Sequence, residues 1–382
     1  MYCSPRLITN KKLVKTLNRG KEKMDLGTLI NNLVKDGTID RVGNSPLTQF
    51  GTRNRRYLGA ELLPEKKTEN AFVEDNIQYR TVVANDGSRY SPAQKKGADL
   101  VGSFEVILGD SDIAREFTGR EYDALLRLIN ASSMDAALSL LNWFEITIVR
   151  ALVELNEKQR WQAIVDAEVV RTGSNSYSET VSYSNPAGHR AAAGSTWSND
   201  ANDPYDDLVT MNALLTSKGY KVSRIVTSTN VLSILTANAI MRTRVGITTI
   251  DNSNNLAAAP GLISHVALNN ILQRDGLPPI ELYDLQYRTQ AGTERFMADD
   301  VMCFFCTTGR DEQLDLGDSV KEVTDTLGYL AVGRPVGAGA SQRSYKLSPF
   351  DNKPPRIEGE GWQTTLPVIT EPEAIAVITS IA

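Results

Sequence analysis

One uninterrupted stretch of apolar periodicity, residues 133–169, most constrains how this chain can fold. Its apolar residues recur every three or four positions without Gly or Pro between them, which indicates one face of a long helix. Ser133 suits an N-cap, and Gly173 with Ser174 offers a stop after the end. At about 1.5 Å per residue such a helix is roughly 55 Å long. The pattern predicts either the spine of an extended subunit or a core helix that breaks near residues 156–160, where the apolar spacing lapses.

Charge is divided unevenly along the chain. Residues 1–60 carry twelve Lys and Arg against four Asp and Glu, whereas the remaining residues carry twenty-nine against forty-two. A basic N-terminal segment can contact nucleic acid or an acidic neighbouring subunit. The cluster Arg53, Arg55 and Arg56 beside Tyr57 favours a solvated or subunit-facing role over nucleic-acid contact. The acidic body argues against a dedicated DNA-binding domain, which usually carries a concentrated basic face.

Cysteine usage favours a reduced, cytoplasmic origin. Cys3, Cys303 and Cys306 are too few for a disulfide framework. Cys303 and Cys306 form a Cys-x-x-Cys, but its Phe-Phe spacer lies in an apolar run, where a strand places the two sulfurs on opposite faces. The chain lacks a run of eighteen apolar residues and a signal-peptide pattern, so we expect no membrane span.

Motifs for catalysis, cofactors and metals are absent from the sequence. His189 and His265 are the two histidines, and neither has a companion at metal-ligand spacing. We interpret His189 as a surface histidine. No nucleophile elbow, phosphate loop or dinucleotide loop occurs. We therefore expect no catalytic residues, no metal and no cofactor, although a soluble α/β enzyme with an unrecognised site stays open.

The first third of the chain lacks a core of its own. Residues 1–65 read as an arm, with a short helix possible at residues 26–34. Residues 76–83 and 103–108 read as two strands of a long β-hairpin with a polar tip. Two strands alone are barely stable in water, so the arm and the hairpin both imply a neighbouring surface.

The remaining segments predict a mixed α and β architecture. Helices are expected at residues 119–130 and 206–218 on apolar spacing, the second with a C-terminal stop signal, and at residues 230–239. Strands are expected at residues 180–183, 222–227, 261–266, 280–287, 301–305, 365–370 and 374–381. The last run is apolar throughout, so we expect it to be paired in a sheet rather than free. This alternation describes a compact α/β or α+β domain.

The order of these pieces resembles the major capsid proteins of tailed bacteriophages with the Hong Kong 97-type fold, in the lambda-like group. The resemblance covers about residues 70–350. Its local matches are Asp203-Pro204 with the following helix, the strand and helix of residues 222–239, Gly276-Leu277-Pro278-Pro279-Ile280 with Tyr283-Asp284 and Tyr287, and Arg295-Phe296-Met297 before Asp300-Val301.

The resemblance implies an α+β capsid fold with five parts. These are an N-terminal arm (1–69), an extended β-hairpin loop (70–118), a peripheral domain with the spine helix (119–204), an axial domain (205–345) and return strands to the peripheral domain (346–382). It implies pentamers and hexamers that close into an icosahedral head around double-stranded DNA, with scaffolding, portal and cement proteins as possible partners. Assembly would take place in the host bacterial cytoplasm.

Two groups of residues are candidates for subunit contacts. The hairpin tip carries Asp86, Arg89, Lys95 and Lys96, and the arm carries the basic cluster named above. Some relatives crosslink a loop lysine to an asparagine of a neighbour, but solvated lysines that protect an exposed hairpin are the favoured interpretation here. An encapsulin-type compartment shell of the same fold is the main alternative function.

Overall fold

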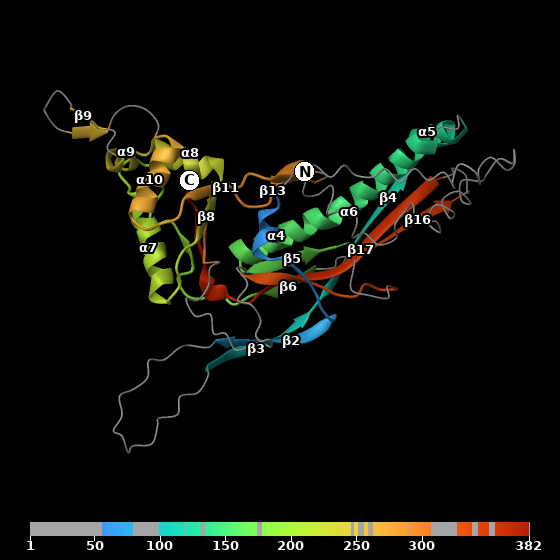
Figure 1. The fold of residues 1–382 in the computed structure, drawn as a ribbon, viewed down its shortest axis with the longest axis horizontal. Helices are drawn as coiled ribbons and strands as arrows, with labels where there is room; N and C mark the ends of the chain where they lie inside the picture. The colour runs from blue at the N-terminus through green and yellow to red at the C-terminus, as the bar shows by residue number, and fades with distance from the viewer. Residues whose placement is uncertain are drawn as a thin grey trace, which may run out of the picture. The chain divides into compact units, whose positions relative to one another are not determined.

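A computed structural model of the chain describes residues 56–78, 99–117, 119–130, 134–173, 178–245, 248–250, 256–258, 263–289, 291–306, 327–337, 343–350 and 356–381 (Figure 1). The described residues divide into two compact units. The larger unit is drawn from Val42–Ile113, Ile146–Ser344 and Gly361–Ala382, and the smaller from Ala114–Glu145 and Tyr345–Glu360. The helix expected at residues 26–34 lies outside the described residues.

The main sheet of the larger unit has the strand order β11-β8-β14-β18-β7. Its strands are β7 (Arg190–Ala192), β8 (Arg224–Thr227), β11 (Ile280–Leu282), β14 (Met302–Phe305) and β18 (Ile375–Thr379). The central strand β14 is antiparallel to both β8 and β18, and all four of its residues are buried. The apolar run expected at residues 374–381 is thus confirmed as a paired strand, which removes the hazard of a free apolar edge.

Capped helices accompany this sheet. α7 (Pro204–Ser217) begins after Asp203, whose side chain accepts a hydrogen bond from the Tyr205 N–H. α8 (Thr229–Ala237) begins after Ser228, whose hydroxyl accepts from the Val231 N–H. Asn238 ends α8 and caps α9 (Ala239–Arg244) by accepting from two N–H groups. The two helices expected at residues 206–218 and 230–239 are therefore confirmed.

The strand expected at residues 261–266 is wrong where the structure describes it. Ser264 accepts a hydrogen bond from the Ala267 N–H and starts α10 (His265–Arg274). Leu268, Ile271 and Leu272 are its buried face. A serine N-cap followed by residues at helical spacing outweighed the short apolar run that suggested a strand.

The long helix is confirmed as α6 (Met134–Val165), and it does not break at residues 156–160. Its end comes earlier than expected. Ala167 adopts a positive φ of 55°, and β5 (Glu168–Thr172) starts directly after it. Arg190 donates hydrogen bonds to the carbonyls of Ile164 and Val165 at 2.9–3.3 Å, so a distant cation caps the helix C-terminus.

The expected hairpin is confirmed in its described part. β2 (Ala71–Gln78) pairs antiparallel with β3 (Asp99–Ile107), starting five residues earlier than predicted for the first strand. Among the described residues these two strands pair only with each other. Val106 and the half-buried Phe72 pack with Tyr329 in a small separate core.

A second sheet contributes to the same small core. β15 (Gly328–Val332) pairs in parallel with β1 (Glu65–Lys67) and antiparallel with β17 (Arg356–Ile369). β17 also pairs with β16 (Ser344–Phe350) and β4 (Gly109–Phe117). The strand expected at residues 365–370 is confirmed, but it is the end of a fourteen-residue strand.

The arm is only partly as expected. α4 (Leu58–Leu62) and its flanks place Tyr57, Leu58, Leu62 and Leu63 in the main core. This part of the arm therefore packs on its own chain and needs no neighbour to cover it. A five-residue helix gives too little periodicity for sequence reasoning to detect.

The smaller unit holds α5 (Arg120–Asn130), which confirms the helix expected at residues 119–130. The buried side chains of this unit include Phe117, Tyr122, Leu125 and Ile357. The remaining described elements of the chain are β6 (Ser178–Ser182), β9 (Thr248–Ile250), β10 (Leu256–Ala258), β12 (Gln286–Arg288), β13 (Thr293–Arg295) and the 3-10 turn η1 (Pro372–Ala374). The described helices include none that is both long and apolar enough to span a bilayer.

Candidate functional site: a buried polar joint on α6

Four polar residues on the last turns of α6 are buried in the larger unit. Asn156, Glu157, Gln159 and Arg160 are each at most 3% exposed. These residues are the lapse in apolar spacing at 156–160. The helix continues because partners from distant parts of the chain bind Asn156, Glu157 and Arg160, which offsets much of the cost of burying them. The buried Gln159 Oε1 and Arg160 Nε have no hydrogen-bond partner. We call Asn156, Glu157, Arg160 and their partners the polar joint.

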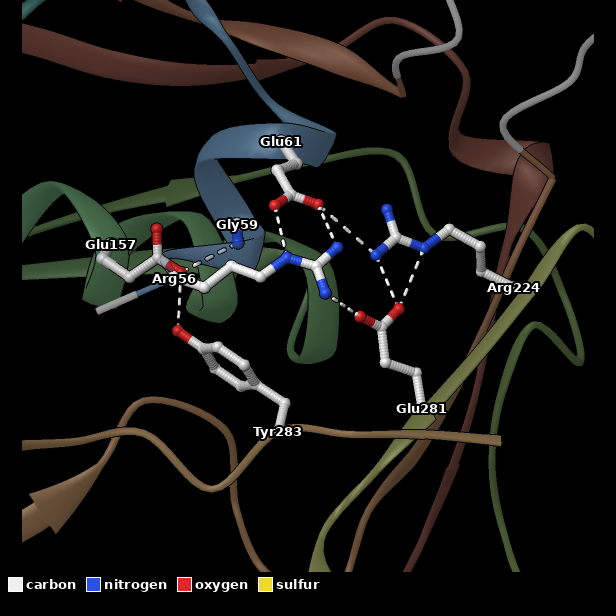
Figure 2. A network of polar contacts seen from close by, with 7 residues as sticks. All are labelled: Arg56, Gly59, Glu61, Glu157, Arg224, Glu281 and Tyr283. Atoms are coloured by element: carbon white, nitrogen blue, oxygen red, sulfur yellow. Dashed lines mark hydrogen bonds and ion pairs between the residues drawn. The ribbon is translucent and has the colours of Figure 1, made fainter. Parts of the chain in front are cut away.

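Glu157 is the centre of the polar joint (Figure 2). Its Oε1 accepts hydrogen bonds from the Gly59 N–H at 2.8 Å, the Trp161 Nε1–H at 3.0 Å and the Tyr283 hydroxyl at 2.8 Å. Burial, and then the Glu157 carboxylate, raise the pKa of Tyr283 well above its usual value, so its hydroxyl stays a donor. One carboxylate thus fastens α4, α6 and the segment after β11.

Gly59 has a steric reason to be glycine. A Cβ built there would lie 2.9 Å from both carboxylate oxygens of Glu157. The α4 backbone can approach the carboxylate this closely only without a side chain.

An outer ring of ion pairs lies beside α4 (Figure 2). Arg56 pairs with Glu61 at 2.6 Å and with Glu281 at 2.5 Å, and Arg224 pairs with Glu281 at 2.6 Å. The Arg56 hydrogen bond lowers the pKa of Glu61, against the opposing effect of burial. The Arg56 side chain is 62% exposed, so solvent screens these pairs and each contributes modestly.

Arg160 extends the joint toward the second sheet. Its guanidinium lies 3.5 Å from Glu157 and 3.8 Å from Glu65. Burial, opposed mainly by Glu157, lowers the pKa of Arg160. Glu65 in turn forms an ion pair with Arg343, so the two arginines share one carboxylate.

Asn156 connects α6 to β17. Gln363 donates to the Asn156 Oδ1 at 2.8 Å, and the Asn156 amide donates back at 3.2 Å. Thr365 also donates to the Asn156 Oδ1, and Arg343 donates to the Gln363 Oε1, both at 3.0 Å. A hydrogen-bond network of this kind fixes the positions of its side chains. Removing one member is costly because it leaves buried partners unpaired.

Sequence reasoning did not identify the polar joint as a site. Its one local signal was the interrupted apolar spacing at 156–160, which was interpreted as a possible helix break. The partners Gly59, Tyr283 and Gln363 are distant in sequence, and nothing local marks them.

Most of the predicted contact residues lie outside the described residues. These are Asp86, Arg89, Lys95 and Lys96 of the hairpin tip and Arg53 and Arg55 of the arm. Arg56 is described, and its guanidinium contacts acids of its own chain.

The interpretation of His189 as a surface residue is wrong. Its side chain is fully buried, and Nδ1 lies 2.8 Å from the Ile375 carbonyl in β18. A lone histidine between Gly188 and Arg190 carries no local signal of burial. Cys303 and Cys306 are also buried, and burial raises the pKa of both thiols to about 12. Among the described residues, no three His, Cys, Asp or Glu side chains gather as metal ligands.

The polar joint fastens segments of one chain to one another within an α+β fold, an arrangement suited to a structural subunit. The comparisons identify the class. The family model described as phage major capsid protein E matches residues 123–379. The chain belongs to this family, and its role is therefore that of a capsid structural protein. The sequence expectation of a phage major capsid protein with an α+β fold of the Hong Kong 97 type is confirmed at this level.

One solved structure supports the fold, and a second is similar at a lower score. A phage-related protein from Bordetella bronchiseptica RB50 has a TM-score of 0.50 at 14% identity, covering 90% of this chain and 99% of that chain. The capsid of Myoviridae phage XM1 has a TM-score of 0.41 at 13% identity, covering 84% and 90%. No curated protein matches the chain in a sequence search.

Proposed function

We propose that copies of this chain form pentamers and hexamers that close into the icosahedral head of a tailed phage around double-stranded DNA. The observation that carries the proposal is the match to the major capsid protein family over residues 123–379. Assembly takes place in the host bacterial cytoplasm, and the virion capsid is the final location. Scaffolding, portal and cement proteins are the further partners in this proposal.

The hairpin and the arm make contacts between neighbouring subunits in this proposal. Its support is that β2 and β3 pair only with each other among the described residues, so that their outer edges have no strand partner there. The tip residues Asp86, Arg89, Lys95 and Lys96 bind a neighbour, and Arg53 and Arg55 anchor the arm. Many such weak contacts, made together in a closed symmetric shell, give a stable particle.

DNA is packaged without sequence recognition in this proposal. The acidic body of the chain supports this role, because a wall of the same charge sign as DNA does not hold the genome by nonspecific adhesion. An encapsulin-type shell is the second candidate, and the family match favours the phage head over it.

Electron microscopy of the purified chain after size exclusion tests the proposal. We expect capsomers or closed shells from the intact chain, and their loss when residues 85–97 are replaced by a short Gly-Ser linker. A matched control keeps the full tip with Asp86, Arg89, Lys95 and Lys96 and replaces only Ser88 and Ser91 by Ala; we expect it to assemble like the intact chain. Small uniform oligomers from the intact chain would contradict the shell. Particles isolated from infected cells that contain protein cargo, and no nuclease-protected DNA, would favour the encapsulin function.

A further inference from the structure

Arg160 and Arg343 are two buried arginines that share the carboxylate of Glu65. Their side chains are 2% and 5% exposed, whereas the side chain of Glu65 is 43% exposed. Arg343 donates to both oxygens of this carboxylate, in the forked geometry by which arginine recognises carboxylates. The Arg160 Nη2 lies 3.8 Å from one of the same oxygens. The two guanidinium groups thus form the inner wall of a site, and the carboxylate is on its solvent side.

Contacts other than those with β1 hold the two guanidinium groups in place. Arg343 donates from Nε to the Gln363 Oε1 at 3.0 Å, and Gln363 is itself bound to Asn156. Arg160 lies on α6, and its Nη1 is 3.5 Å from the Glu157 carboxylate. The inner wall therefore keeps its shape without the carboxylate from β1, which makes it a pre-organised binding site.

The charges at the site match one singly charged anion. Glu157 offsets the charge of Arg160, and Glu65 is the described carboxylate that pairs with Arg343. An arginine keeps its charge in a protein, so removal of the Glu65 carboxylate leaves one buried positive charge without compensation. The buried Arg160 Nε and Nη2 also have no hydrogen-bond partner. Burial would raise the pKa of Glu65, but Arg343 and Arg160 outweigh it and hold that pKa below its usual value.

Glu65 enters the site from the edge of the second sheet. β1 is the edge strand there, and all three of its residues are exposed. Its pairing with β15 and the hydrogen bond from the Thr68 N–H to the Val332 carbonyl at 3.0 Å involve only backbone atoms. Removing the Glu65 carboxylate therefore leaves the strand in place. Because that carboxylate is half exposed, a small solute can reach the two arginines from solvent without unfolding of the chain.

We propose that Arg160 and Arg343 form a binding site for a singly charged carboxylate, and that Glu65 is the chain's own tethered ligand for this site. The inference concerns a single subunit and does not depend on the proposed shell function. The tether gives the Glu65 carboxylate a high effective concentration, so it occupies the site in the intact chain. The segment that follows α4 is thus bound to α6 and β17 as a ligand is bound, and the receptor remains when the ligand is removed.

Glu65→Ala opens the site, and sodium formate is the probe because formate is the smallest carboxylate. We expect formate to recover at least half of the thermal unfolding midpoint that the substitution loses, compared with sodium chloride at the same ionic strength, because a ligand of the folded chain stabilises it. The gain should saturate with concentration. The matched control is Glu61→Ala, which removes a carboxylate from the exposed pair with Arg56 and should gain nothing specific to formate. Equal midpoints of Glu65→Ala in the two salts, or an equal gain in the control, would overturn the proposal.

Two further measurements identify the receptor and cover poor folding. The double variant Glu65→Ala/Arg343→Met lacks the forked donor, so we expect no gain in formate, and a persistent gain would overturn the assignment to this site. Should Glu65→Ala not fold in chloride, the yield of folded chain after refolding is the readout. Folded chain in formate alone supports the site, and no folded chain in either salt overturns it. All samples are kept unassembled, so particle formation does not affect the outcome.

Discussion

Replacing Glu157 by Ala removes the acceptor at the centre of the polar joint. The substitution leaves three donors, Gly59 N–H, Trp161 Nε1–H and Tyr283 O–H, without their partner in a buried site. Each hydrogen bond to a charged group contributes about 1.5–3 kcal/mol. The three contributions do not add fully, because water can enter the site and the surrounding side chains can rearrange to bind the freed donors. Breaking a buried ion pair such as that with Arg160 costs about 3–5 kcal/mol. We expect the free energy of unfolding to fall by about 3–5 kcal/mol.

Urea unfolding followed by tryptophan fluorescence measures this change. The chain is kept unassembled at low concentration, since assembly would add its own stabilisation. Glu157→Gln keeps one carbonyl acceptor, so we expect about half the loss. The matched control is Glu154→Ala on the same helix, whose ion pair with the half-exposed Arg150 at 3.0 Å contributes only about 0.3–0.5 kcal/mol. A loss below about 1 kcal/mol for Glu157→Ala, or one no larger than the control, would refute the reasoning.

Three further predictions concern single sites. Gly361→Ala puts a Cβ 2.6 Å from the Ile148 Cγ2, so we expect about 1–3 kcal/mol lower stability by urea unfolding, and an unchanged midpoint would contradict the packing. Asn238→Ala removes the α9 cap and a donor to the Trp197 carbonyl at 3.1 Å. We expect about 1–3 kcal/mol lower stability, with a smaller loss for Asn238→Ser, whose hydroxyl can still cap the helix; equal losses would contradict the cap. Glu61 has a lowered pKa, so its ionised form stabilises the fold above its unfolded pKa of about 4.3, and this contribution disappears as the pH falls through the folded value. In Glu61→Gln we therefore expect the free energy of unfolding to fall less steeply between about pH 5 and pH 3, the range around the unfolded pKa. An unchanged slope of the free energy of unfolding against pH would contradict this role of Glu61.

Features with local causes could be predicted from the sequence. α7 combines an Asp203 cap, a proline in the first turn and apolar residues at helical spacing, so its pattern is sufficient by itself. β14 is a short apolar run that needs neighbours on both sides, and a central strand is the simplest place for it. The hairpin followed from two strand-like runs around a polar tip.

Features that depend on distant partners could not be predicted. Asn156 and Glu157 are tolerated inside a helix only because Gln363 and Tyr283 reach them from far along the chain. His189 binds the backbone of β18, which is almost two hundred residues later in the sequence. The early end of α6 likewise depends on Arg190, since nothing in residues 166–169 resembles a usual stop signal. Sequence patterns report local preference, and these contacts exist only after the chain has closed on itself.

The polar joint also limits how the length of α6 can change during evolution. One residue inserted between Leu152 and Asn156 would rotate every preceding side chain by about 100° relative to the joint. Ile148 and Leu152 of α6 pack against Gly361 of β17, and such a rotation would turn both side chains away from that strand. An insertion before Ile148 leaves both the joint and this packing in place. We expect related chains to gain or lose residues of α6 only before Ile148. The length of the helix can then vary, while the side chains of its last turns keep the same orientation.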